Sequence, residues 1–303
     1  MTGERAATRP SATTAAGVRW GLLGVTAFSF TVICTRVAVA ELDPLLVGAA
    51  RAVVAASIAA VALIATRQRL PRGRQWIQVL VVAGGVVVGF PLLTSFALTT
   101  APASHGAVVI AVLPAATALA AVLRGRERPG RAFWLAAAAG AVVAVVFASL
   151  GSGEPGRFHA ADLLLLGAVA AAAIGYAEGG LLARELGAWQ TISWSLVVVA
   201  PLMLLLTAAS AARAPVEASP AAWSAFAYFA VVSMFLGFIA WYRGLAIGPM
   251  ARVSQLQLVQ PVLSLVWAAL ILGEPLTPPT LIGGLAVIAC AAVAVRARRR
   301  PPG

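Results

Sequence analysis

The sequence has few of the residues that build an aqueous surface, a disulfide framework or a metal site. Only 11% of its 303 residues are charged, and Lys is absent, so all 22 basic residues are Arg. Soluble domains carry about 25% charged residues. Two Cys and two His are too few for a disulfide framework or a metal cluster. Neither a Gly-rich phosphate loop nor a nucleophile elbow occurs. We therefore expect no cofactor, no metal and no enzymatic activity.

Apolar residues are plentiful instead, at 61% of the chain with a mean hydropathy of +0.94. A membrane-spanning helix needs about 20 mainly apolar residues, and strands of membrane barrels are much shorter. The pattern predicts an all-α membrane protein with ten transmembrane helices in the lipid bilayer. The expected spans lie near 20–40, 45–65, 76–98, 104–123, 132–150, 162–183, 189–209, 222–242, 253–272 and 280–296.

The arginines mark one side of the membrane rather than a nucleic-acid site. A net charge of +12 would gather on one face in a nucleic-acid-binding protein, whereas here most arginines lie between apolar runs. With the N-terminus inside, 18 of the 22 fall on the cytoplasmic side and only Arg157 and Arg213 on the other. Both termini are therefore predicted to be cytoplasmic, and no nucleic-acid partner is expected.

A signal peptide is the alternative interpretation of the first span, because Ala38-Val39-Ala40 resembles a cleavage site. Arg36 interrupts the apolar segment just before that site. Cleavage would also remove one helix of an internal pair. We therefore expect the first span to be retained.

The two halves of the chain share three anchors at a constant offset of 147 residues. The matched pairs are Pro102 and Pro249, Pro114 and Pro261, and Glu127 and Glu274. Because five helices separate the copies, the second copy enters the membrane from the opposite side, which makes an inverted repeat. The predicted units are a cytoplasmic tail at 1–19, a five-helix repeat at 20–150, a second repeat at 162–296 and a basic cytoplasmic tail at 297–303.

Inverted repeats with interrupted helices are typical of secondary transporters, which bind substrate near the midplane where the repeats meet. Pro114 and Pro261 each remove a backbone donor in mid-span and free a carbonyl. Such prolines can also merely kink a helix. Their matched positions favour a pair of helix breaks beside a binding site.

The ordered pattern resembles the EamA-type ten-helix transporters of the drug/metabolite transporter superfamily over about residues 20–298. The residues that carry the resemblance are Arg36, Pro44, Arg51, Ala101-Pro102-Ala103, Pro114, Glu127, Gly248-Pro249-Met250, Pro261 and Glu274. The resemblance implies two inverted repeats, a central cavity lined mainly by helices 1, 3, 4, 6, 8 and 9, and movement of small organic metabolites, often outward. Two departures are Phe28-Ser29, where many relatives have an aromatic-glycine pair, and Glu178.

Glu178 is the only acidic residue well inside a predicted span. A carboxylate there costs about 2.5–3.5 kcal/mol on insertion scales, so it should face the bundle interior or water. Removal from water favours the neutral carboxyl, which suits a group that couples transport to protons. The alternative is a structural ion pair with Arg184 or Arg243.

Arg36 and Arg51 lie inside two antiparallel neighbouring spans near the outer face. Two guanidinium groups at similar depth would bind a carboxylate bidentately. The competing interpretation is that they snorkel to the interface or pair with Glu41 and Asp43 in the connecting loop.

A polar stripe on the 253–272 span consists of Gln257, Gln260 and Ser264, which share one helix face. The first half has Ile110, Leu113 and Thr117 at the corresponding positions, so the repeat alone does not require the stripe. It indicates either substrate recognition beside Pro261 or hydrogen bonds between helices.

Further candidates for the cavity are Tyr176, Trp241, Thr94 and His105. Gly175, Gly179 and Gly180 near Tyr176 provide either close helix packing or room for substrate. Trp241 and Tyr242 come at the predicted end of a span, where aromatic residues often mark the membrane interface. Trp267 is placed deeper.

These features predict a multi-pass secondary transporter of a bacterial inner membrane that works by alternating access. Export of a small amphipathic metabolite or drug against proton entry is favoured, by a monomer or a homodimer. The alternative is an importer of amino acids or related metabolites with the same fold. A receptor or assembly subunit would need large soluble loops or tails, which the sequence lacks.

Overall fold

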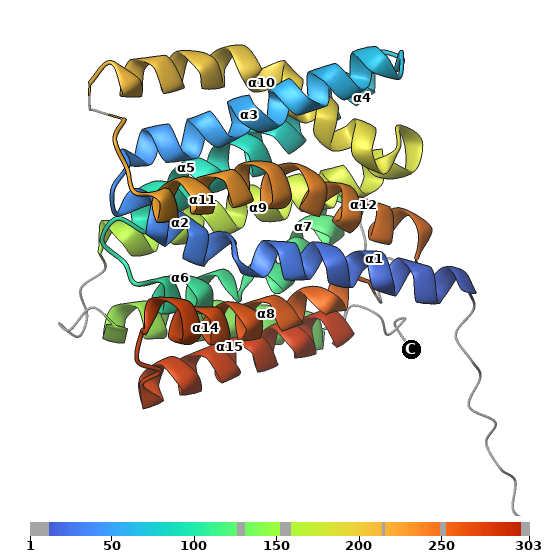
Figure 1. Ribbon diagram of the computed structural model, residues 1–303. Helices are drawn as coiled ribbons and strands as arrows, with labels where there is room; N and C mark the ends of the chain where they lie inside the picture. Colours follow the sequence, from blue (N-terminus) through green and yellow to red (C-terminus); the bar gives the residue numbers. More distant parts are fainter. Residues whose placement is uncertain (1–11, 126–130, 152–158, 214–215, 249–252, 298–303) are drawn as a thin grey trace, which may run out of the picture.

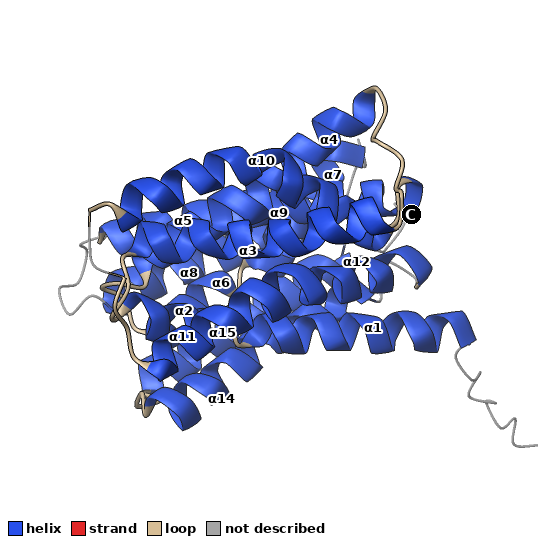
Figure 2. Cartoon of the chain, turned by 45° about the horizontal axis from the view of Figure 1, so that its top comes forward, coloured by secondary structure: helices blue, strands red, loops and turns tan. Residues whose placement is uncertain are grey.

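The computed structural model describes residues 12–125, 131–151, 159–213, 216–248 and 253–297, and every regular element among them is a helix (Figures 1 and 2). The elements of the first half are α1 (Ala12–Ser29), α2 (Thr31–Val39), α3 (Pro44–Ala65), α4 (Arg74–Val82), η1 (Ala83–Gly89), α5 (Phe90–Ala97), α6 (Ala103–Ile110), α7 (Leu113–Gly125) and α8 (Arg131–Gly151). Those of the second half are α9 (Ala160–Glu185), α10 (Ala188–Ala211), α11 (Pro220–Ala227), η2 (Tyr228–Gly237), α12 (Phe238–Ile247), η3 (Ser254–Val259), α14 (Gln260–Leu272) and α15 (Pro278–Ala297).

Several helical segments are long and apolar enough to cross a membrane. Seven such segments are found among the described residues, and they are Ala15–Val39, Pro44–Ala65, Arg74–Ala97, Ala103–Arg124, Ala160–Glu185, Ala188–Ala211 and Pro220–Ile247. Two shorter apolar helices follow at Leu256–Leu272 and Pro278–Val293. The sequence placed the end of one span at residue 242, whereas the helix continues to Ile247.

The surface of the bundle is apolar, as a lipid-facing surface must be. Large apolar side chains such as Ile64, Leu135 and Leu270 are each more than 70% exposed. Contiguous exposed apolar surface of this kind is unusual in soluble monomers. Together with the long apolar helices, it makes the chain a multi-pass membrane protein.

The repeat seen in the sequence is visible in the helix boundaries. α14 begins and ends 147 residues after α7, and α15 begins 147 residues after α8. The π-helical segments η1 and η2 overlap at the same offset. Glu127 and Pro249, which anchor the repeat in the sequence, lie outside the described residues, as do most of the two predicted tails.

The two halves are interleaved rather than set side by side. α3 packs on α10, α8 on α15, α1 on α12 and α7 on α9, so each of these contacts joins one half to the other (Figure 1). α3 and α10 occupy corresponding positions in the repeat, as do α8 and α15. A cavity between the halves therefore has walls from both.

Carboxylates at helix ends hold the loops at the left end of the bundle in Figure 1. Asp43 accepts hydrogen bonds from the backbone N–H groups of Leu45 and Leu46 at 3.0 and 3.1 Å, and Pro44 begins α3. This is the usual N-terminal cap. Glu274 likewise accepts from the N–H groups at the start of α6, at 2.8 Å from Ala103 and 2.7 Å from Ser104.

Glu41 ties the loop before α3 to the start of α11 in the other half. Its carboxylate accepts a hydrogen bond from the backbone N–H of Ser219 at 2.6 Å and one from the Ser219 hydroxyl at 2.7 Å. These two bonds favour the charged form and lower the pKa of Glu41 below its ordinary value. Both hydrogen bonds to the Glu41 carboxylate are therefore present at neutral pH, and they weaken when the carboxylate is protonated.

Glu41→Gln is expected to reduce the acid sensitivity of the fold. Because the pKa of Glu41 is lowered in the folded chain, its contribution is fully present above the ordinary carboxyl pKa and is lost as the pH falls through the lowered value. Melting midpoints of purified protein between neutral and acid pH should fall less steeply in Glu41→Gln than in the wild type. Glu217→Gln, at an exposed position before the same helix, should keep the wild-type slope, and equal slopes in all three proteins would contradict the assignment.

Candidate functional site

A cavity of about 30 Å³ lies between the two halves. Its walls come from α1, α2, α3, η1 and α5 of the first half and from α9, η2, α12 and α14 of the second. A buried water needs about 10–15 Å³ of such space, so the cavity in this conformation has room for about two waters. An organic substrate would enter only after the walls separate.

Two π-helical segments supply matching parts of the wall. Val86 of η1 and Ser233 of η2 both line the cavity and stand at corresponding positions of the repeat. A π-helix widens the turn of an α-helix and occurs frequently at functional sites. Apolar periodicity alone gave no indication of these two segments, because both are apolar almost throughout and show no readable period.

An aromatic cluster borders the cavity. The ring centroid of Phe28 lies 6.3 Å from that of Tyr176, 4.9 Å from Phe238 and 6.5 Å from Trp241. The expectation that Trp241 and Tyr242 mark the membrane interface was wrong, because their side chains are 1% and 0% exposed. Both rings face the bundle interior, where Trp241 packs against Phe28 and Tyr176 and Tyr242 packs against Phe238. Tyr176 itself lines the cavity.

The two proline breaks meet at a smaller space of about 10 Å³. Pro114 lies at the start of α7, just after α6 ends, and Pro261 lies at the start of α14, where the 3₁₀ segment η3 ends. Both line this space together with the polar stripe of Gln257, Gln260 and Ser264. The matched breaks of the two halves are thus in contact with one small, partly polar cavity.

The polar stripe is only partly hydrogen-bonded. Ser264 donates a 2.8 Å hydrogen bond to the carbonyl of Ser29. Gln257 Nε2 and Gln260 Oε1 are buried and have no hydrogen-bond partner within the part of the chain that the structure describes. Gln260 also lines the central cavity. Interhelical hydrogen bonding therefore accounts for Ser264 but leaves these two amide atoms without a structural role.

Ser29 stands at the break between α1 and α2, and the sequence marked it only as a departure from the family pattern. Its hydroxyl accepts a 3.0 Å hydrogen bond from Trp267 Nε1. Trp267 also stacks on Phe30 with ring centroids 4.6 Å apart. Trp267 is therefore held inside the bundle by α1 and α2.

Glu178 lies in an ion pair that joins the two halves. Arg124 donates from Nε to Glu178 Oε2 at 2.7 Å and from Nη2 to Oε1 at 3.1 Å, and Gln78 Nε2 donates to Oε1 at 2.8 Å. The Glu178 side chain is 6% exposed and that of Arg124 39% exposed. The expected partners were wrong. Arg184 lies six residues along the same helix and so on another face, and Arg243 lies over the ring of Trp20.

An open hollow of about 430 Å³ between α7 and α9 adjoins this ion pair. Its walls are mainly alanine and leucine side chains, with Arg124 and Glu178 at the border. Leu123 and Ile174 on its rim are 67% and 53% exposed. The hollow is therefore an apolar recess beside the ion pair.

Arg36 and Arg51 do not act as a pair. Arg36 Nη1 donates to the carbonyls of Leu98 and Thr99 at 2.6 and 2.8 Å, beyond the end of α5. Arg51 is 2% exposed, lines the central cavity and lies with Cζ 5.1 Å from the ring centroid of Phe229.

The alternative expectation for these arginines, pairing with the loop carboxylates, is also wrong. Glu41 binds Ser219, and Asp43 binds the start of α3 together with the hydroxyl of Ser210. Backbone N–H groups and hydroxyls at the ends of helices, which sequence spacing does not reveal, satisfy both carboxylates.

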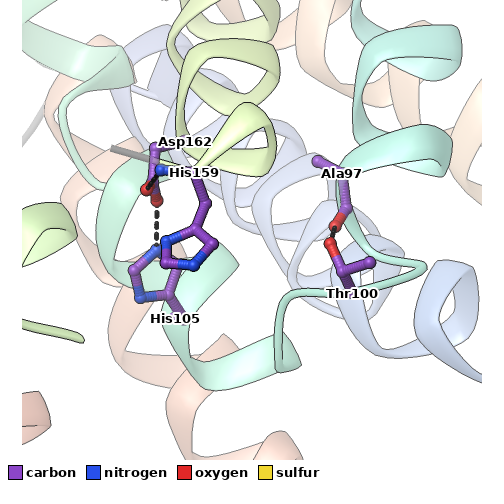
Figure 3. A network of polar contacts seen from close by, with 5 residues as sticks. All are labelled: Ala97, Thr100, His105, His159 and Asp162. Atoms are coloured by element: carbon purple, nitrogen blue, oxygen red, sulfur yellow. Dashed lines mark hydrogen bonds and ion pairs between the residues drawn. The ribbon is translucent and has the colours of Figure 1, made fainter. Parts of the chain in front are cut away.

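Thr94 and His105 lie away from the central cavity. The Thr94 hydroxyl donates to the carbonyl of Phe90 at 2.7 Å, within its own segment. His105 Nε2 lies 2.7 Å from Asp162 Oδ1 at the start of α9, as Figure 3 shows. Asp162 also accepts from the backbone N–H of His159, the N-cap of α9. This contact joins α6 to α9 at the end of the bundle opposite the Glu178 ion pair.

A bundle of apolar helices in two matched halves, with a partly polar cavity between them, is the architecture of a membrane transporter. The sequence matches the model of the EamA-like transporter family over residues 15–150 and 159–296. The chain belongs to this family, which forms part of the drug/metabolite transporter superfamily.

Two known proteins illustrate the relationship. The chain is 43% identical over 284 residues to the Bacillus subtilis (strain 168) protein named "Uncharacterized transporter YdeK", with 91% of this chain and 96% of that protein covered. It also resembles a protein of known crystal structure with a TM-score of 0.66 and 20% identity, covering 94% of this chain and 98% of the other. The second likeness concerns the fold alone.

Proposed function

We propose that the protein is a secondary active transporter that moves a small organic metabolite or drug across a bacterial inner membrane by alternating access. Ten transmembrane helices form two inverted repeats, with both termini in the cytoplasm. The observation that carries this proposal is the central cavity, whose walls come from both halves and include the matched segments η1 and η2. A site between inverted repeats becomes accessible from one side at a time when the repeats rock.

In the described conformation, polar contacts join the two halves at both ends of the bundle. His105 and Asp162 join α6 to α9 at one end. Arg124 and Gln78 bind Glu178 at the other. If a transport cycle opens the cavity at one end at a time, the contact at that end would break while the contact at the other end remains.

Proton coupling is assigned to Glu178. Protonation would remove the charge that holds Arg124, and it would weaken the tie between α7 and α9. The exposure of Arg124 supports this role, because its side chain is 39% exposed and brings one end of the ion pair, and with it the buried carboxylate, to the surface. We propose export of substrate against proton entry. The alternative is an importer of amino acids or related metabolites with the same fold.

The test compares metabolites inside and outside cells that express the wild type, Glu178→Gln or no transporter. An exporter enriches one or a few compounds in the medium and depletes them in the cells, whereas an importer does the reverse. The compound found should then move in proteoliposomes that contain only the purified protein. A metabolite profile identical to that of cells without the transporter, together with no movement in proteoliposomes, would contradict the proposal.

A further inference from the structure

We infer that the substrate site in the central cavity binds an organic anion, with its acidic group on Arg51 and an apolar body against the aromatic wall. The inference rests on the proposed function and names the class of its substrate. It assigns to Arg51 alone a role that the sequence suggested for two arginines. Arg36 is excluded because its guanidinium is bound to the carbonyls of Leu98 and Thr99.

Arg51 is a buried cation without a counter-ion. Its side chain is 2% exposed, and its Nε is buried without a hydrogen-bond partner. No hydrogen bond or ion pair involving Arg51 is found within the described ranges, and no acidic residue lines the cavity there. Burying an uncompensated charge within a membrane protein is costly, so such groups usually pair or serve a function. An anion in the cavity would complete the site.

The geometry leaves Arg51 free to bind an acidic group. One face of the guanidinium lies over the ring of Phe229, with Cζ 5.1 Å from the ring centroid. No hydrogen bond to another described residue occupies its N–H donors, so they are available for bidentate recognition of a carboxylate. The hydroxyls of Thr31 and Ser233 line the same cavity and are hydrogen-bonded to each other at 2.6 Å, so one of the two O–H groups is left to donate to a further oxygen.

The other walls define the rest of the ligand. Phe28, Tyr176 and Phe238 form an apolar aromatic surface on the same cavity. Because no Asp or Glu among the described residues lines it, an ammonium group would find no partner of opposite charge. The site therefore favours a simple carboxylic acid over an amino acid of the same shape.

The test uses four probes that share one aromatic body and differ only in charge. They are 3-phenylpropionate, its uncharged amide, 3-phenylpropylamine and the zwitterion phenylalanine. Binding to purified wild-type protein is measured by tryptophan fluorescence and by thermal shift. The acid should bind at least about 30-fold more tightly than the amide, which corresponds to one charge-assisted pair, and more tightly than the amine or the zwitterion. Equal binding of acid and amide would overturn the inference, as would equal protection by chloride alone.

Substitution of Arg51 decides whether this side chain is responsible. Arg51→Met should reduce acid binding to the level of the amide and leave amide binding unchanged. Arg51→Lys, which keeps the charge but loses the planar fork, should retain an intermediate preference and provides the test if Arg51→Met does not fold. Arg213→Gln removes an exposed positive charge elsewhere and should bind like the wild type. A preference for the acid that persists in Arg51→Met, or in Arg51→Lys at full strength, would contradict the assignment.

The melting midpoint of the ligand-free protein separates a binding role from a structural one. Removing an unpaired buried cation should raise the midpoint of Arg51→Met, whereas loss of a structural arginine would lower it. These binding assays do not depend on transport. Binding without movement in proteoliposomes would therefore refute the proposed function alone, and movement without any preference for acids would refute only this inference.

Discussion

Glu178→Gln is expected to abolish transport driven by a pH gradient while exchange of substrate at equal pH continues. Gln has nearly the same shape as Glu, and its carbonyl oxygen can accept the two bonds that Oε1 receives from Arg124 Nη2 and Gln78. Its NH2 group replaces Oε2 and loses the bond from Arg124 Nε, and the amide carries no proton to release. In proteoliposomes that contain the compound identified by the metabolite comparison, gradient-driven movement should fall to the level of protein-free vesicles. Counterflow of labelled for unlabelled compound should persist, because it needs the binding site and not the proton.

The matched control for this experiment is Glu185→Gln. Glu185 is exposed at the end of the same helix, α9, so the substitution makes the same change of charge without touching the ion pair. It should transport like the wild type. Gradient-driven movement that survives in Glu178→Gln, or that is lost equally in both variants, would rule out the coupling role and leave a structural ion pair.

Gly85→Ala is expected to be among the most destabilising single-methyl changes in the chain. A Cβ at Gly85 would lie 2.4 Å from the carbonyl oxygen of Ala171 and 3.0 Å from Cα of Gly175, so η1 and α9 would have to move apart. Overpacking commonly costs about 1–3 kcal/mol, and here both obstacles are backbone atoms that cannot rotate away. We expect a loss of about 3 kcal/mol, seen as a fall of about 5 °C in the melting midpoint for a chain of this length.

The neighbouring residue provides the control. A Cβ at Gly84 would meet no atom within 4 Å, and the position is exposed. Gly84→Ala therefore makes the same chemical change one residue away and should leave the melting midpoint unchanged or slightly raised, because Ala favours helix over Gly. Equal effects of the two substitutions would show that helix propensity, and not the approach of η1 to α9, governs stability here.

Most of the fold could be predicted from the apolar pattern and the repeat. Helices are the way for an apolar chain to satisfy its backbone in lipid, and the 147-residue offset found from three anchors reappears in the limits of α7 and α14. The pattern did not separate π from α turns in η1 and η2. It also ended one span too early, because the charge of Arg243 was taken as the end of the apolar run.

Partners of the polar residues were harder to predict, because they are set by contacts between distant segments. Glu178 and Arg124 are 54 residues apart, and the sequence offered nearer arginines instead. Arg36 and Arg51 looked equivalent in the sequence, yet a carbonyl pair holds one and an aromatic ring in the cavity faces the other. Of the predicted cavity residues, Arg51, Tyr176 and Gln260 line the central cavity, whereas Arg36, Thr94 and His105 do not. Phe229 and Ser233 also line it, but no sequence pattern singled them out.

The ion pair at Glu178 has no counterpart in the other half of the repeat. Thr31 and Ile271 occupy the positions that correspond to Glu178 and Arg124 at the 147-residue offset. Under the proposed coupling, acidification would therefore change the rate of one half-cycle far more than that of the other. The substrate and proton gradients would still set the direction of net transport. The rate of transport, however, would be higher with the acidic solution on one side of the membrane than on the other.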